Sequence, residues 1–384
     1  MRCSTLLALV LLAGWSHGDA ISAVDQGQKP VVPPFPAGRD AAAAQGLDAN
    51  AKRREEREQR AEAALEKSLA CLAKLQAGSL DGSFPNSTAE HAVPVAVAAL
   101  CALAYMAGGS TPDRGPQGSE LSRVIDYLVT RCDLAPGSTH RGYISSDGDE
   151  LSRMHGHGFA TLALAEAAAM SPSTPRGARV QAALEAAVHL IETSQGSEGG
   201  WEYQPRPTYE HENSVTVCLV QALRGAHGAG VHVDPTVIAR AVEYIRRCQS
   251  EDGSFRYALN QNRTSAALTA ASIATLNATG VYDGPSIARG LDYLARELAA
   301  RDGEHEIGES RYPHYERLYV AEALWQASDT RLWETWRAKT VAQLESEQLP
   351  DGSWPDAQFG AAYATAVNSL VLAIPLGLLP VFQR

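Results

Sequence analysis

The sequence predicts an all-α protein, an (α/α)6 toroid in which six helical hairpins close into a ring. Three observations predict this fold. A short phrase recurs along the chain, an amphipathic helix precedes each copy, and a helix that is apolar on nearly all sides follows it. No extended stretch alternates polar and apolar residues with a period of two, so the pattern disfavours repeats built from β-strands.

The recurring phrase consists of Gln, a short spacer, a Gly-containing turn and an aromatic residue. Its aromatic positions are Phe84, Tyr143, Trp201, Phe255 and Trp354, of which the second belongs to a degenerate copy. The intervals between them are 59, 58, 54 and 99 residues. Because the last interval is about twice the others, we expect a hidden copy near residues 302–303. Six units of roughly 50–60 residues are typical of a repeat protein.

Residues 235–249 illustrate the helix that precedes the phrase. Its apolar side chains share one face and are Ile238, Ala241, Val242, Ile245 and Cys248. Asp234 can cap this helix and Pro235 suits its first position. Residues 93–106 illustrate the helix that follows a phrase, with Ala, Val, Leu and Cys almost without interruption. A helix that is apolar on all sides is buried on all sides.

Inner helices of this kind favour a closed ring over an open superhelix, because an open superhelix needs polar end repeats. Residues 370–382, at the end of the last unit, are mostly apolar and fit closure. We therefore expect residues 51–384 to form one toroid domain, with a central cavity between the inner helices.

The first 20 residues have the features of a secretory signal peptide. A positive start at Met1-Arg2 precedes an apolar run over residues 6–13 and small residues at 18–20. The run is too short to span a membrane. We expect signal-peptide cleavage, export to the periplasm or the medium, and a flexible Pro/Ala-rich leader over residues 21–50. We expect no membrane span in the mature chain.

The charge and cysteine content exclude several classes of protein. The chain has 33 Lys+Arg and 44 Asp+Glu, a net charge of −11, and lacks a basic block, so a nucleic-acid partner is not expected. Six cysteines are too few for a disulfide scaffold in this length. Cys71 with Cys101, or Cys218 with Cys248, could pair if their helices align, and buried free thiols are the alternative.

The Gln…Asp-Gly-Ser-Phe/Trp phrase resembles the repeat of the prenyltransferase and squalene-cyclase superfamily. Residues 154–162 and 363–384 look like an exported bacterial branch of it, and the resemblance extends over roughly residues 60–384. It implies a six-hairpin toroid in which the repeat Gln and aromatic residue are structural, here Gln76, Gln249, Gln348, Trp201 and Trp354. It also implies a small apolar ligand, such as an isoprenoid, in the cavity.

The chemistry of that superfamily does not carry over. Its protonating cyclases use an Asp-x-Asp-Asp acid, and this sequence has no adjacent Asp pair; the acidic string at residues 147–150 is interpreted as a solvated turn. Its protein prenyltransferases bind zinc with an Asp two residues before a Cys, an arrangement that this sequence lacks. We therefore predict neither a metal nor a cofactor, and enzymatic activity stays open.

Histidines and acids recur where the inner helices begin, so a closed ring would gather them at one mouth. Together such residues can act as general acid and base near neutral pH. The candidate catalytic residues are Asp149, His157 and Glu212. The candidate ligand-binding residues are His91, His155, His211, Tyr312, His314, Tyr315 and Arg317. Arg153, Arg263, Arg311 or Arg317 could meet an anion. The alternative for the histidines is a structural role at the helix starts.

Three functions remain open on this fold. The first is binding or transformation of an isoprenoid or other apolar ligand. The second is a non-catalytic binding or scaffold protein whose partner the sequence does not specify. The third is a polysaccharide lyase or hydrolase, which needs two carboxylates across a polar groove. The lining of the ring separates them: a wide dry cavity indicates lipid, a wet acidic cleft sugar, and a filled centre a scaffold.

Overall fold

The computed structural model describes residues 37–85, 89–147, 149, 151–170, 173–301, 310–327 and 330–383, with side chains from residue 50 onward. The predicted signal peptide and the hidden repeat copy near residues 302–303 lie outside these ranges. The chain divides into two compact units, Met1–Lys52 and Arg53–Arg384. Helix α1 (Ala37–Ala77) begins within the predicted leader, so residues 37–50 are helical there, consistent with their alanine content.

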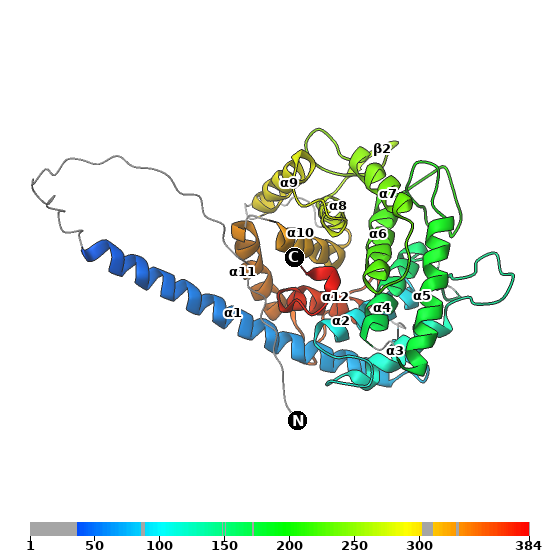
Figure 1. The fold of residues 1–384 in the computed structure, drawn as a ribbon. Coiled ribbons are helices and arrows are strands. Elements are labelled where there is room, and N and C mark those ends of the chain that lie inside the picture. Colours follow the sequence, from blue (N-terminus) through cyan, green and yellow to red (C-terminus); the bar gives the residue numbers. More distant parts are fainter. Residues whose placement is uncertain are drawn as a thin grey trace, which may run out of the picture. The chain divides into compact units, whose positions relative to one another are not determined.

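The second unit is built of six helical hairpins (Figure 1). Its outer helices are the remainder of α1, α3 (Gly118–Thr130), α5 (Pro175–Thr193), α7 (Pro235–Arg247), α9 (Pro285–Arg301) and α11 (Thr330–Glu347). Its inner helices are α2 (Pro94–Ala107), α4 (Met154–Met170), α6 (Asn213–Gly228), α8 (Ala266–Ala278), α10 (Pro313–Gln326) and α12 (Ala361–Ala373). A hairpin of β1 (Arg256–Ala258) and β2 (Gln261–Thr264) precedes α8. The short 3-10 helices η1 (Ile374–Leu376) and η2 (Pro380–Phe382) follow α12.

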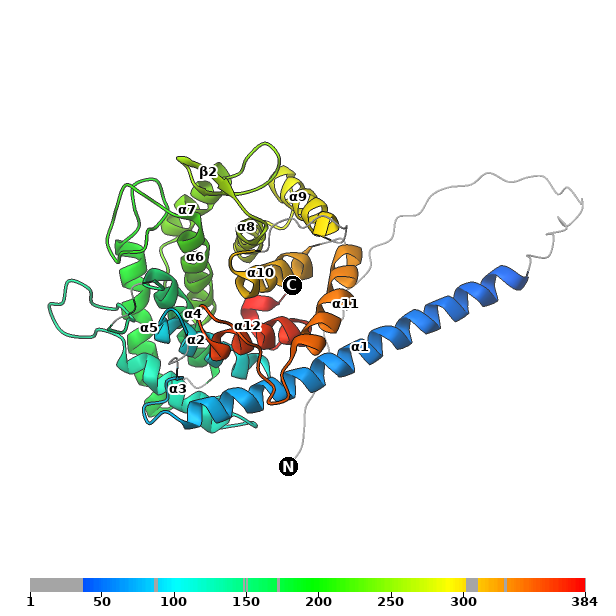
Figure 2. The same ribbon diagram turned by 180° about the vertical axis from the view of Figure 1, so that it is seen from behind.

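The inner helices form a closed ring, as Figures 1 and 2 show from opposite sides. Each packs against two others in the order α2, α4, α6, α8, α10, α12, and α12 packs against α2. Their middle turns are buried throughout, as their apolar composition predicts. The prediction of an all-α toroid of six hairpins is therefore confirmed.

Polar contacts join the last hairpin to the first. Arg337 of α11 is fully buried, and its guanidinium donates to the carbonyl of Val371 at 2.9 Å and to the Glu58 carboxylate of α1 at 2.9 Å. The hydroxyls of Ser68 and Ser369 lie 2.7 Å apart. Since the last carbonyls of a helix have no partner within it, Arg337 satisfies the end of α12 while it ties three helices together.

The repeat glutamines connect each turn to the next outer helix. The Gln348 amide donates to Gly352 O at 3.0 Å and to Ala64 O at 2.9 Å. Gln76, Gln195 and Gln249 make the same pair of contacts in their own units. The glycine is required because its φ is +93° at Gly352 and a Cβ there would lie 2.4 Å from Lys67 O.

The aromatic residue of the phrase anchors the turn to the hairpin. The Trp354 indole donates to Leu344 O at 2.9 Å, and its backbone N–H donates to the Thr365 hydroxyl at 3.1 Å. Trp201 makes the equivalent backbone contact with Thr216 at 3.1 Å, and Phe255 makes it with Thr269 at 3.0 Å. A residue in the first turns of the inner helix therefore braces the turn before it.

In the second unit Ile144, and not Tyr143, occupies the anchor position. Ile144 follows Gly142 by two residues, as Trp201 follows Gly199, and both glycines have positive φ. Ile144 is fully buried, whereas Tyr143 is half-buried. The sequence interpretation was wrong by one residue here because the anchor needs an apolar side chain, and isoleucine meets that need without an aromatic ring.

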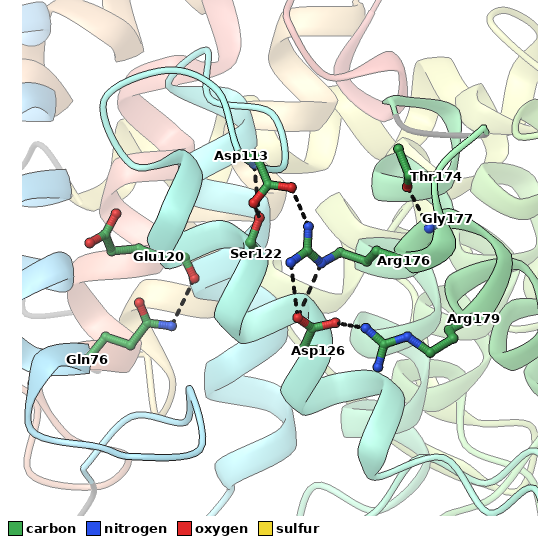
Figure 3. A network of polar contacts seen from close by, with 9 residues as sticks. All are labelled: Gln76, Asp113, Glu120, Ser122, Asp126, Thr174, Arg176, Gly177 and Arg179. Carbon is green, nitrogen blue, oxygen red and sulfur yellow. Dashed lines mark hydrogen bonds and ion pairs between the residues drawn. The ribbon is translucent and has the colours of Figure 1, made fainter.

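An ion-pair network joins two outer helices (Figure 3). The Asp126 carboxylate of α3 pairs with Arg176 at 3.2 Å and with Arg179 at 2.5 Å, both from α5. Arg176 also pairs with Asp113, which accepts from the Ser122 hydroxyl at 2.7 Å. These ion pairs hold the second and third hairpins together.

The cysteines from Cys71 onward are all buried free thiols, which decides between the two sequence alternatives. The bridges considered from the sequence, Cys71–Cys101 and Cys218–Cys248, do not form. Across the described ranges, none of the helices combines the length and the apolar character that crossing a bilayer requires.

Candidate functional site

Partly exposed side chains of the ring lie at the N-terminal ends of the inner helices, which we call the mouth. Apart from their last turns, the inner helices are exposed or partly exposed only near their starts, at Pro94, His155, Phe159, Ser214, Pro313, Tyr315, Arg317, Ala361 and Tyr363. A cavity wide enough for water would leave its lining residues accessible, and the middle turns are not. Within the described part of the chain, the centre of the ring is therefore filled, which differs from the predicted central cavity. By the criterion given above, a filled centre favours a scaffold, so a ligand-binding or catalytic role has to rest on the mouth alone.

Polar side chains meet inside the filled centre. The Gln221 amide donates to the Glu322 carboxyl at 2.9 Å, and the Tyr319 hydroxyl donates to Gln221 at 3.2 Å. Burial raises the pKa of Glu322 to about 8. At the far end of the ring, the Trp325 indole donates to Phe382 O at 3.0 Å, which holds the C-terminal segment against α10.

Six side chains come together at the mouth, and we call them the mouth cluster. They are His155, Tyr203, Glu212, Ser214, Tyr257 and Tyr315. The His155 and Tyr203 rings lie 5.4 Å apart, and the hydroxyls of Tyr203 and Tyr257 lie 2.6 Å apart. Elements far apart in sequence supply them: α4, the turn after Trp201, the start of α6, strand β1 and α10.

Glu212 is the central acid of the mouth cluster. Burial raises the pKa of its carboxyl, the hydroxyls of Tyr257 and Tyr203 lower it, the Glu202 charge raises it and the Arg263 charge lowers it, with a net rise. Its Oε2 atom is buried and accepts no hydrogen bond from the described residues. The hydroxyls of Ser214 and Tyr315 are likewise buried without a well-aligned partner. Buried polar atoms in a folded protein are normally paired, so this gathering points to a ligand site.

His155 of the cluster and Arg263 beside it add further polar groups to the mouth. Burial lowers the pKa of His155 to about 4, so its imidazole is neutral at physiological pH. The guanidinium carbon of Arg263 lies 4.3 Å from the centre of the Tyr257 ring, on the exposed side of the hairpin. The mouth therefore combines aromatic faces, a carboxyl, a neutral imidazole and a guanidinium.

Of the three predicted catalytic residues, the structure places only Glu212 in the mouth cluster. His157 is fully buried, its Nδ1 accepts from the Ile144 N–H at 3.2 Å, and burial lowers its pKa to about 3. Asp149 accepts from the backbone N–H of Ser152 at 2.8 Å and from its hydroxyl, just before α4 begins. Both therefore have structural roles at helix starts.

The predicted ligand-binding residues divide into three groups. His155 and Tyr315 belong to the mouth cluster. His211 is turned away, with its Nε2 2.9 Å from Thr208 O, and it braces the loop before α6. The remaining residues lie near the starts of α2, α10 and α12, and they are His91, Tyr312, His314 and Arg317.

Aromatic rings dominate that last group. The Phe359 ring lies 6.1 Å from His91, 6.0 Å from Tyr312 and 5.1 Å from Tyr363. These rings extend the aromatic lining beyond the mouth cluster, toward the seam where the ring closes.

Polar and charged side chains near these rings contact one another. His314 Nε2 lies 3.6 Å from the Asp356 carboxylate, and burial and the Arg317 charge lower the pKa of His314. Arg317 donates to Asn368 at 3.0 Å and to Glu347 at 3.3 Å, so it is engaged within the protein.

Sequence reasoning missed Tyr203, Ser214 and Tyr257. The two tyrosines each lie two residues after a repeat anchor, Trp201 and Phe255 respectively, and Asp356 has the same offset from Trp354. The offset in the repeat was therefore a usable signal for residues that face the mouth.

Comparison with solved structures shows the same architecture in proteins of different activity. The type II terpene cyclase MstE from Scytonema, solved with geranylgeranyl dihydroxybenzoate, matches at 18% identity and TM-score 0.57, over 84% of this chain and 99% of that one. The GH76A α-1,6-mannanase from Salegentibacter matches at 9% identity and TM-score 0.57, over 82% and 99%. A glycosidase solved with glucose matches at 15% identity and TM-score 0.57, over 84% and 98%.

The chain has the α/α toroid fold that terpene cyclases and glycosidases share. The similarity to the cyclase confirms the fold implied by the sequence resemblance. No model of a known protein family and no curated protein matches the sequence. A toroid hosts several chemistries, so the activity has to be argued from the mouth cluster itself.

Proposed function

We propose that this protein hydrolyses a glycan at the mouth cluster, with Glu212 as the general acid. The observation that carries the proposal is the Glu212 carboxyl beside two tyrosine hydroxyls: its pKa is raised, and its Oε2 atom accepts no well-aligned hydrogen bond from the described residues. A carboxyl with a raised pKa stays protonated closer to neutral pH. That is the property a group needs to donate a proton to the oxygen of a leaving sugar.

Glu202 supplies the second carboxylate. Its charge raises the pKa of Glu212, which means that the two acids share one electrostatic neighbourhood. The backbone N–H of Gln204 donates to the Glu202 carboxylate at 3.0 Å and orients it. Glycoside hydrolases pair one protonated and one ionised carboxyl. Glu212 gives its proton to the glycosidic oxygen as the C–O bond breaks, and Glu202 takes a proton from the water whose oxygen bonds to the anomeric carbon.

The aromatic rings of the cluster suit a sugar ligand. Tyr203, Tyr257 and Tyr315 offer apolar faces and hydroxyl groups in one place, which matches the apolar faces and hydroxyls of a pyranose. Two of the toroids reported above are glycosidases by their descriptions, so the fold can support such a reaction. That likeness supports the proposal and does not decide it.

An isoprenoid ligand is the second candidate, and the aromatic group around Phe359 favours it. The similar cyclase was solved with a geranylgeranyl compound, which is consistent with an aromatic-lined toroid binding such chains. As a catalyst of alkene protonation, however, Glu212 is disfavoured, because alkenes need a strong acid and burial makes this carboxyl a weaker one. The isoprenoid candidate is therefore binding without cyclisation.

The test compares purified full-length protein with Glu212→Gln and Glu202→Gln variants on a panel of polysaccharides, with release of reducing ends as the readout. Glu243→Gln on an exposed face of α7 is the matched control. We expect activity in the wild type and the control, and losses of about 100-fold or more in the two variants. Wild-type turnover in Glu212→Gln would contradict the proposal. Failure on all glycans combined with polyprenyl binding would favour the second candidate, and failure of both would favour a scaffold.

We also propose that the protein is exported, on the strength of residues 1–20. N-terminal sequencing of the protein isolated from its natural host should find a start near Ile21. An intact Met1 in the cytosolic fraction would refute export.

A further inference from the structure

A guanidinium is held on the rim of the mouth by the β-hairpin. Arg263 of β2 lies over the Tyr257 ring of β1, 4.3 Å from its centre to the guanidinium carbon. Its side chain is exposed, and no ion pair joins it to a carboxylate of the described residues. Stacking on an aromatic face orients a guanidinium while it leaves the N–H donors at the edge free for a ligand.

The hairpin is anchored so that this position is defined. Arg256, opposite Thr264 in the β register, donates to the backbone carbonyls of Arg247 at 2.7 Å and of Cys248 and Leu259 at 3.3 Å each. The two arginines of the hairpin therefore differ in role. The Arg256 guanidinium donates to backbone carbonyls, whereas the Arg263 guanidinium is exposed to solvent at the mouth.

The surroundings of Arg263 suit an anionic ligand. Of the three other arginines that the sequence singled out, Arg317 is already paired with Glu347 and Asn368. Arg311 lies over the Tyr312 ring, outside the mouth cluster, with its guanidinium carbon 5.4 Å from the ring centre. Buried oxygen atoms of Glu212, Ser214 and Tyr315, which lack a well-aligned hydrogen-bond partner among the described residues, lie in the same cluster. A ligand that presents an anionic group and hydroxyls together would satisfy all of these groups.

We propose that the substrate carries a carboxylate, as in a uronate-containing oligosaccharide, and that Arg263 binds this carboxylate while the glycosidic oxygen faces Glu212. The inference rests on the proposed glycan-acting function of the site. Arginine suits this task because its planar fork of N–H donors matches a carboxylate in a two-point contact. Arg263 is then the residue that sets specificity for acidic over neutral sugars.

The test measures binding by calorimetry with the Glu212→Gln protein, which retains the mouth without turnover. The ligands are oligosaccharides of galacturonate, glucuronate and mannuronate, each beside its neutral galactose, glucose or mannose counterpart and a sulfated one. We expect one uronate to bind at least 10-fold more tightly than its neutral counterpart, and the preference to weaken as salt is added. Adding Arg263→Gln should remove the preference, and Arg263→Lys should restore part of it.

Several outcomes would overturn the inference. Equal binding of uronate and neutral sugars, a preference that survives Arg263→Gln, or tighter binding of the sulfated sugar would each refute carboxylate recognition by Arg263. Hydrolysis of a neutral glycan in the assay above would then leave the proposed function standing alone. Failure to bind any of these oligosaccharides would refute both the inference about Arg263 and the proposed function. Because Arg263 is exposed, its variants should unfold at the wild-type temperature, which a melting curve checks.

Discussion

The Nδ1 atom of His157 accepts a hydrogen bond from the backbone N–H of Ile144 at 3.2 Å. The Thr216 hydroxyl accepts the same bond from Trp201 in the next unit. His157 and Thr216 are both the fourth residue of their inner helices, so a histidine does in one repeat what threonine does in its neighbours. With Nδ1 as the acceptor, the ring proton resides on Nε2 and the imidazole is neutral.

This relationship predicts how substitutions at position 157 behave. His157→Thr keeps an acceptor for the Ile144 N–H, whereas His157→Val has nearly the same shape without one. We expect the Val variant to be less stable than the Thr variant by about 1–2 kcal/mol, because it leaves a buried N–H unpaired. Urea unfolding measures the difference. Thr216→Val is the matched control and should cost a similar amount relative to wild type.

His157→Thr should leave turnover unchanged. If the His157→Thr protein is folded yet loses turnover on a glycan that the wild type hydrolyses, the structural assignment of His157 is wrong. Equal stability of the Thr and Val variants would also contradict it.

The fold could be predicted because each unit repeats the same physical solution. A glutamine, a glycine with positive φ and a buried anchor recur at similar intervals, and the inner helices are apolar on all sides. The mouth was predictable as a place, since helix starts of a closed ring must meet. Which side chains enter it was not, because His155 and His157 differ by two residues and point about 160° apart on a helix. Residue type carries no information on that rotation.

The sequence also could not predict that the centre of the ring is filled. Ala, Val and Leu line an empty cavity and a packed core equally well, and only the helix-to-helix distance separates the two. The Glu322 and Gln221 pair in the centre interrupts apolar stretches of α10 and α6, a sequence signal for buried polar residues that was not used.

The repeat glycines lead to a second prediction. Gly352 has φ of +93°, and a Cβ there would lie 2.4 Å from Lys67 O, which is backbone of α1 and cannot move aside. Gly230 has φ of +88° with nothing within 4 Å. Gly230→Ala should therefore cost about 1 kcal/mol, the conformational penalty alone. Gly352→Ala should cost about 3 kcal/mol or more, since it adds a clash at the ring closure.

Denaturant unfolding of the two glycine variants side by side gives the comparison. Equal losses would show that contact between the turn and α1 does not limit position 352, and so would contradict the role assigned to this glycine.

A third prediction concerns the buried Glu322. Its pKa is about 8 in the folded protein against an ordinary 4.5, so the folded state binds more protons than the unfolded state between these values. Stability must therefore fall as pH rises from about 4.5 to about 8. Glu322→Gln stays neutral and still accepts from Gln221, so it should exceed wild type by about 2–4 kcal/mol at pH 8 and match it at pH 4.

Unfolding of Glu322→Gln and wild type across this pH range measures that gap, with Glu243→Gln as an exposed control that should show none. A gap that is constant with pH would mean that packing, and not protonation, sets the difference.

The last prediction concerns Glu212 itself. The Tyr203 hydroxyl lowers the pKa of Glu212 and the Glu202 charge raises it, against the larger effect of burial. Tyr203→Phe should therefore move the titration of Glu212 to higher pH, and Glu202→Gln should move it to lower pH. Carbon NMR of the labelled carboxyl follows this titration without any substrate. Tyr209→Phe, on a side chain 92% exposed, is the control and should leave it unchanged. Shifts of the same sign in both variants would mean that Glu202 and Tyr203 do not act on Glu212 as its surroundings indicate, and a proton donor at this position would lose its support.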